Sequence, residues 1–149
     1  MLIRSLIDGY ADQPPDPGAD DFMSRLQLKQ VDRDIFTGWC HAGSPLRAFG
    51  GQVAAQALVA AGATVDDEVR DIHSLHAYFL RPGRTTDHIV YMVDRPRDGR
   101  SFATRRVVAR QARGIVAVLT ADFHHDEPGV EYETPPTPGI PGPDGLPVG

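Results

Sequence analysis

The stretch that decides the fold is FGGQVAAQALVAAGAT, residues 49–64. Glycines open it at Gly50 and Gly51 and close it at Gly62, and apart from two glutamines every residue between them is small or apolar. A surface helix would carry a charged face, and this stretch has none. The sequence therefore predicts a helix from about Gly51 to Gly62 that is buried almost all round.

Four strand-like runs follow this helix and suggest what covers it. They are DIHSLHAYFLR (71–81), HIVYMVD (88–94), SFATRRVVARQA (101–112) and GIVAVLTADFHH (114–125), separated by the turn signals Pro82-Gly83, Asp98-Gly99 and Arg113-Gly114. Such short connections favour an antiparallel meander over a parallel sheet, which needs long crossovers. Upstream, residues 25–39 fit neither period cleanly, and we expect one bent strand there. Together these elements predict an α+β hotdog fold, in which a curled antiparallel sheet wraps around one long central helix.

Proline and glycine delimit the folded part. Of the 13 prolines, residues 126–149 hold seven and residues 11–20 hold three. We therefore expect a mobile leader at 1–21, a hotdog domain at 22–125 and a Pro/Gly-rich linker or tail at 126–149. A folded part of this length supports one hydrophobic core but not two.

Charge and cysteine content restrict the class of protein. The net charge is −5, and the single cysteine, Cys40, cannot form an internal disulfide. The N-terminal MLIRSLIDGY is too short for a signal peptide, and no apolar run approaches the ~20 residues of a membrane span. We expect a cytoplasmic protein that does not bind a membrane.

The predicted helix carries no ionisable residue. Gln52 and Gln56 share one of its faces, but an amide cannot act as a general base. One interpretation is that Gly50, Gly51 and Gln52 expose backbone N–H groups at the helix N-terminus, where the helix dipole helps bind a carbonyl oxygen or an anion. The alternative is a tight helix start, with glycines chosen for close packing. We assign no catalytic residue, and keep Gly51, Gln52 and His73 as weak candidates.

Arginines are concentrated in one segment. Residues 95–113 hold seven arginines against one acid, a local charge of +6. They could bind the phosphates of a nucleotide-bearing substrate, or they could be solvated, since strand alternation places Arg106 and Arg110 on one face and Arg105 on the other with Val107. Nucleic acid is disfavoured because aromatic stacking platforms do not alternate with these arginines.

The histidines do not predict a metal site. His73 and His76, like His124 and His125, are an odd number of residues apart, so in a strand they point to opposite faces. We expect one of His73 and His76 to face the core and the other the surface. No metal or other cofactor is expected.

Three motifs resemble a known family. FGGQVAAQAL, HSLHAYFLRPG and RDGRSFATRRV are similar, in order and spacing, to the N-terminal half of bacterial acyl-CoA thioesterase II and its peroxisomal relatives, from about Phe36 onward. The resemblance implies an enzyme of two hotdog domains that hydrolyses acyl-CoA to fatty acid and CoA with an activated water and no cofactor. It also implies that CoA phosphates bind at Arg97, Arg100, Ser101 and Arg105, around the Gly-Arg-Ser turn.

In that family the water-activating Asp, Ser or Thr, and Gln belong to the second hotdog, and the present sequence ends at the linker. The resemblance therefore implies a supporting half that supplies a substrate groove and pairs with itself or with a second hotdog. A non-catalytic acyl-CoA-binding or dimerisation module is the alternative. A hotdog enoyl-CoA hydratase is weaker, because it needs an acid/base pair beside the helix.

Overall fold

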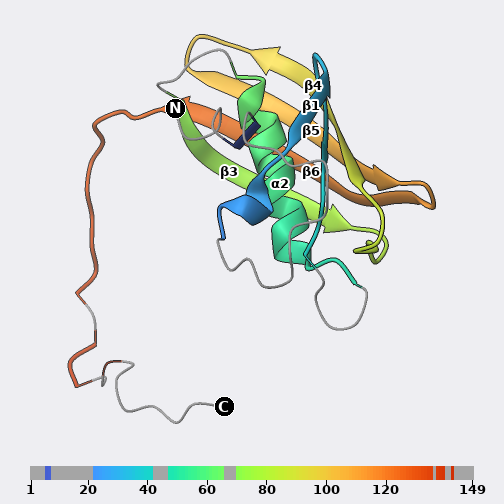
Figure 1. The fold of residues 1–149 in the computed structure, drawn as a ribbon. Helices are drawn as coiled ribbons and strands as arrows, with labels where there is room; N and C mark the ends of the chain where they lie inside the picture. Colours follow the sequence, from blue (N-terminus) through green and yellow to red (C-terminus); the bar gives the residue numbers. More distant parts are fainter. Residues whose placement is uncertain are drawn as a thin grey trace.

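The computed structural model describes residues 6–7, 22–41, 47–65, 70–135, 137–139 and 142. Within this part, a 14-residue helix lies across one face of a six-stranded antiparallel sheet (Figure 1). The elements are η1 (Ser24–Leu26), β1 (Lys29–Asp32), β2 (Ile35–Gly38), α2 (Gly50–Ala63), β3 (Arg70–Phe79), β4 (Ile89–Asp98), β5 (Phe102–Gln111) and β6 (Gly114–His125). The predicted hotdog architecture is confirmed.

Helix α2 begins and ends within one residue of the prediction. Its small side chains let the helix pack closely on β4, β5 and β6, and only Gly51 among its residues is exposed. Its most deeply buried apolar side chains are those of Val53, Ala57, Ala60 and Ala61. The expectation of a helix buried almost all round is confirmed.

Strand alternation separates an inner from an outer sheet face. On β5, Ala103, Val107 and Ala109 point inward and are almost fully buried, while Arg106 and Arg110 are exposed on the outer face. The same period of two buries alternate residues of β6. The predicted division of the arginines between the two faces is confirmed.

The predicted meander is wrong in the position of one strand. The sheet order is β1-β2-β4-β5-β6-β3, so β3 pairs with β6 rather than with β4. The Pro82-Gly83 segment is therefore a crossover, held by a hydrogen bond of 2.9 Å from the Ala48 N–H to the Gly83 carbonyl. Pairing with β6 places β3 at the sheet edge, where its apolar side chains Ile72, Leu75 and Phe79 stay exposed.

The single bent strand expected at residues 25–39 is also wrong. The segment forms η1 and then an antiparallel hairpin of β1 and β2. The side chain of Asp32 accepts a hydrogen bond of 2.7 Å from the Arg33 N–H, and Gln30 donates to the Arg33 carbonyl at 3.0 Å. These local bonds stabilise a turn that the hydrophobic period does not reveal.

The two predicted flanks are only partly described. Most of the expected leader, residues 1–21, lies outside the described residues, but Leu6 is buried in the core and its carbonyl accepts a hydrogen bond from the Leu28 N–H at 2.9 Å. At Leu6 the expected leader therefore packs against the hotdog domain. In the expected tail, residues 126–135 form no helix or strand, and Tyr132 is 89% exposed.

Candidate functional site

The two glutamines of α2 connect the helix to the N-terminal segment. The Nε2 atom of Gln52 donates to the carbonyl oxygens of Arg25, at 2.7 Å, and Trp39, at 3.3 Å. Gln56 Nε2 donates to the same two oxygens, at 2.8 Å each. The Oε1 atom of Gln52 accepts a hydrogen bond from the backbone N–H of His41 at 3.0 Å. Both polar atoms of the Gln52 amide are thus hydrogen-bonded to backbone groups.

Behind these glutamines lies a buried polar cluster. The Tyr91 hydroxyl donates to Gln56 Oε1 at 2.6 Å, and Cys40 Sγ lies 3.8 Å from the same oxygen. Burial raises the pKa of the Cys40 thiol to about 12. Burial, followed by the neighbouring Cys40, also raises the pKa of Tyr91 well above its ordinary value. Both groups stay protonated at neutral pH, so Cys40 is not an activated nucleophile.

The glycines at the start of α2 pack closely against two aromatic rings. A Cβ on Gly50 would lie 3.3 Å from the Phe79 ring, and one on Gly51 would lie 2.6 Å from the Phe49 ring. These contacts support the close-packing interpretation. They do not exclude the interpretation that backbone N–H groups bind a ligand here, because Gly51 is exposed in the first helical turn.

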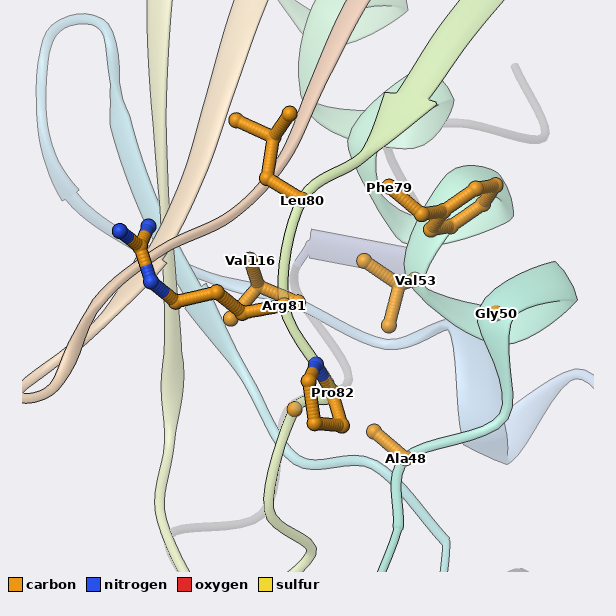
Figure 2. A pocket seen from close by; sticks show the side chains of 9 residues that line it. Ala48, Gly50, Val53, Phe79, Leu80, Arg81, Pro82 and Val116 are labelled. Atoms are coloured by element: carbon orange, nitrogen blue, oxygen red, sulfur yellow. The ribbon is translucent and has the colours of Figure 1, made fainter.

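Two cavities flank this first turn. The first, here called the α2–β3 pocket, has a volume of about 340 Å³ and is lined by Ala48, Gly50, Val53, Phe79, Leu80, Arg81, Pro82, Gly83 and Val116 (Figure 2). Its lining is apolar except for Arg81, whose guanidinium points away from the helix in Figure 2 and donates to the Ile115 carbonyl at 3.0 Å. Of the exposed apolar side chains at the end of β3, Phe79 and Leu80 line this pocket.

The second cavity, of about 500 Å³, contains the predicted pair Gly51 and Gln52. Its lining comprises Phe22, Arg25, His41, Phe49, Gly51, Gln52 and Ala55. The structure therefore brings Gly51 and Gln52 together on a cavity wall, as the sequence suggested, although the Gln52 amide is already hydrogen-bonded.

Arg105, predicted to bind CoA phosphates, is inside the protein. Its side chain is fully buried, and it donates to the Thr64 hydroxyl at 2.8 Å and to the Thr64 and Arg97 carbonyls at 3.0 Å each. It also forms an ion pair of 2.5 Å with Asp98. Arg105 thus links β5 to the residue that follows α2, and in this structure its side chain is not exposed to solvent. Arg97 and Arg100 are exposed and Ser101 is half-buried.

The predicted carbonyl-binding and phosphate-binding groups do not meet. Gly51 lies in the first turn of α2, whereas Arg105 bonds to Thr64, directly after the last turn. A helix of 14 residues is about 20 Å long, so the two groups lie at opposite ends of the domain core.

His73 lies at the same end as the Gly99 turn. Its ring centroid is 5.6 Å from those of both Phe102 and His124. His73 and His76 are both exposed, so the expectation that one faces the core is wrong. Among the described residues, no group of three or more His, Cys, Asp or Glu side chains is arranged to hold a metal ion.

One feature that the sequence reasoning missed lies beside the α2–β3 pocket. An isolated antiparallel bridge places Arg47 directly opposite Arg84. Both are exposed, and neither belongs to the arginine-rich segment 95–113. No local pattern marks this pairing, because it joins two residues that are far apart in the chain.

Comparisons with known proteins agree with this fold. The family model described as "Acyl-CoA thioesterase N-terminal domain" matches residues 36–124. Acyl-coenzyme A thioesterase 8 of Homo sapiens is 37% identical over 121 residues, which are 81% of this chain and 38% of that protein. Acyl-CoA thioesterase 2 of Haemophilus influenzae is 42% identical over 117 residues, 78% of this chain and 41% of that protein.

Solved structures show the same relationship. The acyl-CoA thioesterase II TesB2 of Mycobacterium marinum superposes with a TM-score of 0.66 at 39% identity, over 79% of this chain and 44% of that one. A hot dog fold protein from Alicyclobacillus acidocaldarius, at 23% identity and a TM-score of 0.68, supports the fold alone.

The chain belongs to the family of acyl-CoA thioesterase N-terminal domains. It spans about two fifths of the length of the curated relatives that it matches, 38% of one and 41% of the other. In the described part of the chain, no helix has the length and apolar character needed to cross a bilayer.

Proposed function

We propose that this chain acts as the N-terminal hotdog half of an acyl-CoA thioester hydrolase, which converts acyl-CoA and water to fatty acid and CoA. The observation that carries the proposal is the family match over residues 36–124 to a domain of acyl-CoA thioesterases. The structure adds a reason for a supporting role. Helix α2 carries no ionisable side chain, and its two glutamine amides are bound by backbone carbonyls. The helix therefore supplies no general base to either cavity.

A second hotdog domain is the partner that we propose. Strand β3 is a ten-residue edge strand, and the helix packs against β2, β4, β5 and β6. An exposed edge with apolar side chains, Tyr78 at 63% and Phe79 at 55% exposed, is a surface that proteins normally cover. Either a second copy of this chain or a fused second hotdog would cover it. The cytoplasm remains the compartment that we predict.

A non-catalytic acyl-CoA-binding module is the second candidate. The same observation favours it, because cavities flank the first turn of α2 while the helix itself carries no acid or base. It differs from the first proposal in predicting binding without turnover in any combination of domains.

A thiol-release assay on medium- and long-chain acyl-CoA separates the two. The assay uses this chain, a separately prepared second hotdog bearing the Asp, Ser/Thr and Gln, and their mixture. We expect the chain alone to be roughly 10²- to 10⁴-fold slower than the mixture, the usual cost of a missing general base.

Two results would change the assignment. Fast turnover by this chain alone, lost in Gln52→Ala or His73→Ala, would place a working site on this half. Acyl-CoA binding without turnover in the mixture would favour the binding module.

A further inference from the structure

Arg47 and Arg84 form an unusual pair. Residues directly opposite in an antiparallel bridge have Cβ atoms only about 4.5–5.5 Å apart, and like charges in such positions repel. Among the described residues, neither side chain has a hydrogen bond or an ion pair with an acid. The bridge thus concentrates two exposed positive charges that no acid among the described residues neutralises.

The backbone beneath this pair is fixed. The buried side chain of Gln111 accepts from the Arg84 N–H at 2.9 Å and donates to the Arg84 and Asp87 carbonyls at 2.7 and 2.8 Å. The nearest acid along the chain, Asp87, bonds through its carboxylate to Thr86. The backbone at Arg84 is therefore set by the fold, which lowers the cost of ordering this arginine around a ligand.

The pair is also adjacent in sequence to residues that line an apolar cavity. Ala48 and Gly83, the chain neighbours of Arg47 and Arg84, both line the α2–β3 pocket and are hydrogen-bonded to each other. Arg81 lies on the same pocket (Figure 2). An apolar cavity whose lining is continuous in the chain with two exposed arginines suits a ligand with a long apolar part and an anionic part.

We propose that Arg47 and Arg84 form an anion site that binds the phosphates of acyl-CoA, with the apolar part of the ligand in the α2–β3 pocket. The choice of acyl-CoA rests on the proposed function. Arginine forks match phosphate oxygens in pairs, and one phosphate dianion neutralises both charges.

The segment around Arg100 is a poorer phosphate site. Arg105 is buried there and already bound, and Asp98 belongs to the same hairpin. The cavity beside His73 is lined by three acids, Asp71, Asp126 and Glu127. These negative charges oppose phosphate binding at that end of the domain.

The test is calorimetric titration of the whole chain with CoA, with pantetheine, which lacks phosphate, and with inorganic pyrophosphate. We expect Arg47→Ala and Arg84→Ala each to weaken CoA and pyrophosphate binding roughly 10- to 100-fold, the effect of a lost charged hydrogen bond. Arg84→Lys keeps the charge and should retain part of the affinity. Pantetheine binding should not change.

Two exposed arginines serve as controls of equal charge. Arg33→Ala, in the β1–β2 turn, should leave CoA affinity unchanged, and Arg100→Ala tests the site that the sequence suggested. Circular dichroism melting of each variant establishes that it is folded.

The outcomes separate this inference from the proposed function. Unchanged CoA affinity in both Arg47→Ala and Arg84→Ala, or a larger loss in Arg100→Ala, overturns the anion site and leaves the thioesterase proposal standing. Pyrophosphate binding that depends on the pair, without any binding of CoA or acyl-CoA, supports the anion site and counts against acyl-CoA as its ligand.

Discussion

Gln52 and Gln56 lie one turn apart on α2 and donate to the same two backbone carbonyl oxygens, those of Arg25 and Trp39. Each carbonyl therefore keeps a donor when one glutamine is removed and loses both when the two are removed together. The two glutamines thus connect the helix to η1 and to the residue that follows β2.

We predict that Gln56→Leu destabilises the protein by about 2–3 kcal/mol, because the buried Tyr91 hydroxyl loses its acceptor. Gln52→Leu should cost less, since Gln56 still satisfies both carbonyls. The double variant should exceed the sum of the single effects by about 1 kcal/mol. Urea unfolding of the four proteins measures this coupling, and strict additivity would contradict it.

We predict that Arg105→Lys destabilises the protein by about 2–3 kcal/mol, below the usual cost of breaking a buried ion pair because Asp98 is half exposed. Lysine cannot reproduce the fork that reaches both the hydroxyl and the carbonyl of Thr64. The matched control is Arg106→Lys, on the outer face of the same strand, which should change stability by less than about 0.5 kcal/mol. Equal effects in the two variants would refute the structural role of Arg105.

We predict a loss of stability at high pH that depends on Cys40. The unfolded thiol ionises near its ordinary pKa of 9.0, whereas burial raises the pKa of the folded thiol to about 12. Between these values the unfolded chain has released a proton that the folded chain retains, so stability falls as pH rises.

Urea unfolding at a series of pH values above 9 tests this expectation. Cys40→Ala should show a shallower fall than wild type, with the remainder arising from Tyr91, whose pKa is raised in the same direction. Identical pH profiles would show that the thiol does not contribute.

We predict that the apolar edge strand drives association. Leu75→Lys, on the exposed inner side of β3, should shift the protein toward the 16.2 kDa monomer in light scattering. Val31→Lys is the control, because Val31 is similarly exposed on β1, at the opposite edge of the sheet. A wild-type protein that is already monomeric, or association lost equally in both variants, would argue against β3.

The sequence predicts the parts of this fold that depend on local periodicity. Helix α2 is recognisable because its glycines and small residues are contiguous, and β5 and β6 because apolar residues alternate. The position of β3 is not recognisable in this way, because its pairing with β6 joins residues as distant as Arg70 and His125. The turn signal Pro82-Gly83 is the same for a hairpin and for a crossover.

The candidate site was harder to predict than the fold. Arg105 shares the face of the buried Val107, but the local density of arginines and the Gly-Arg-Ser turn suggested a phosphate site there. Arg47 and Arg84 attract no attention in the sequence, since only tertiary pairing places them together. CoA contacts at Arg97, Arg100 and Ser101 remain a prediction.

The segment matched by the family model is shorter at its N-terminal end than the set of residues that packs together in this fold. The family match begins at residue 36, yet the carbonyl of Arg25 accepts both buried amides and the carbonyl of Leu6 accepts from Leu28. A protein trimmed to the matched segment would lose these acceptors and expose the apolar side of α2 that η1 covers. Residues that alignment leaves outside the domain are therefore part of its interior, and expression of an autonomous domain should start upstream of Leu6.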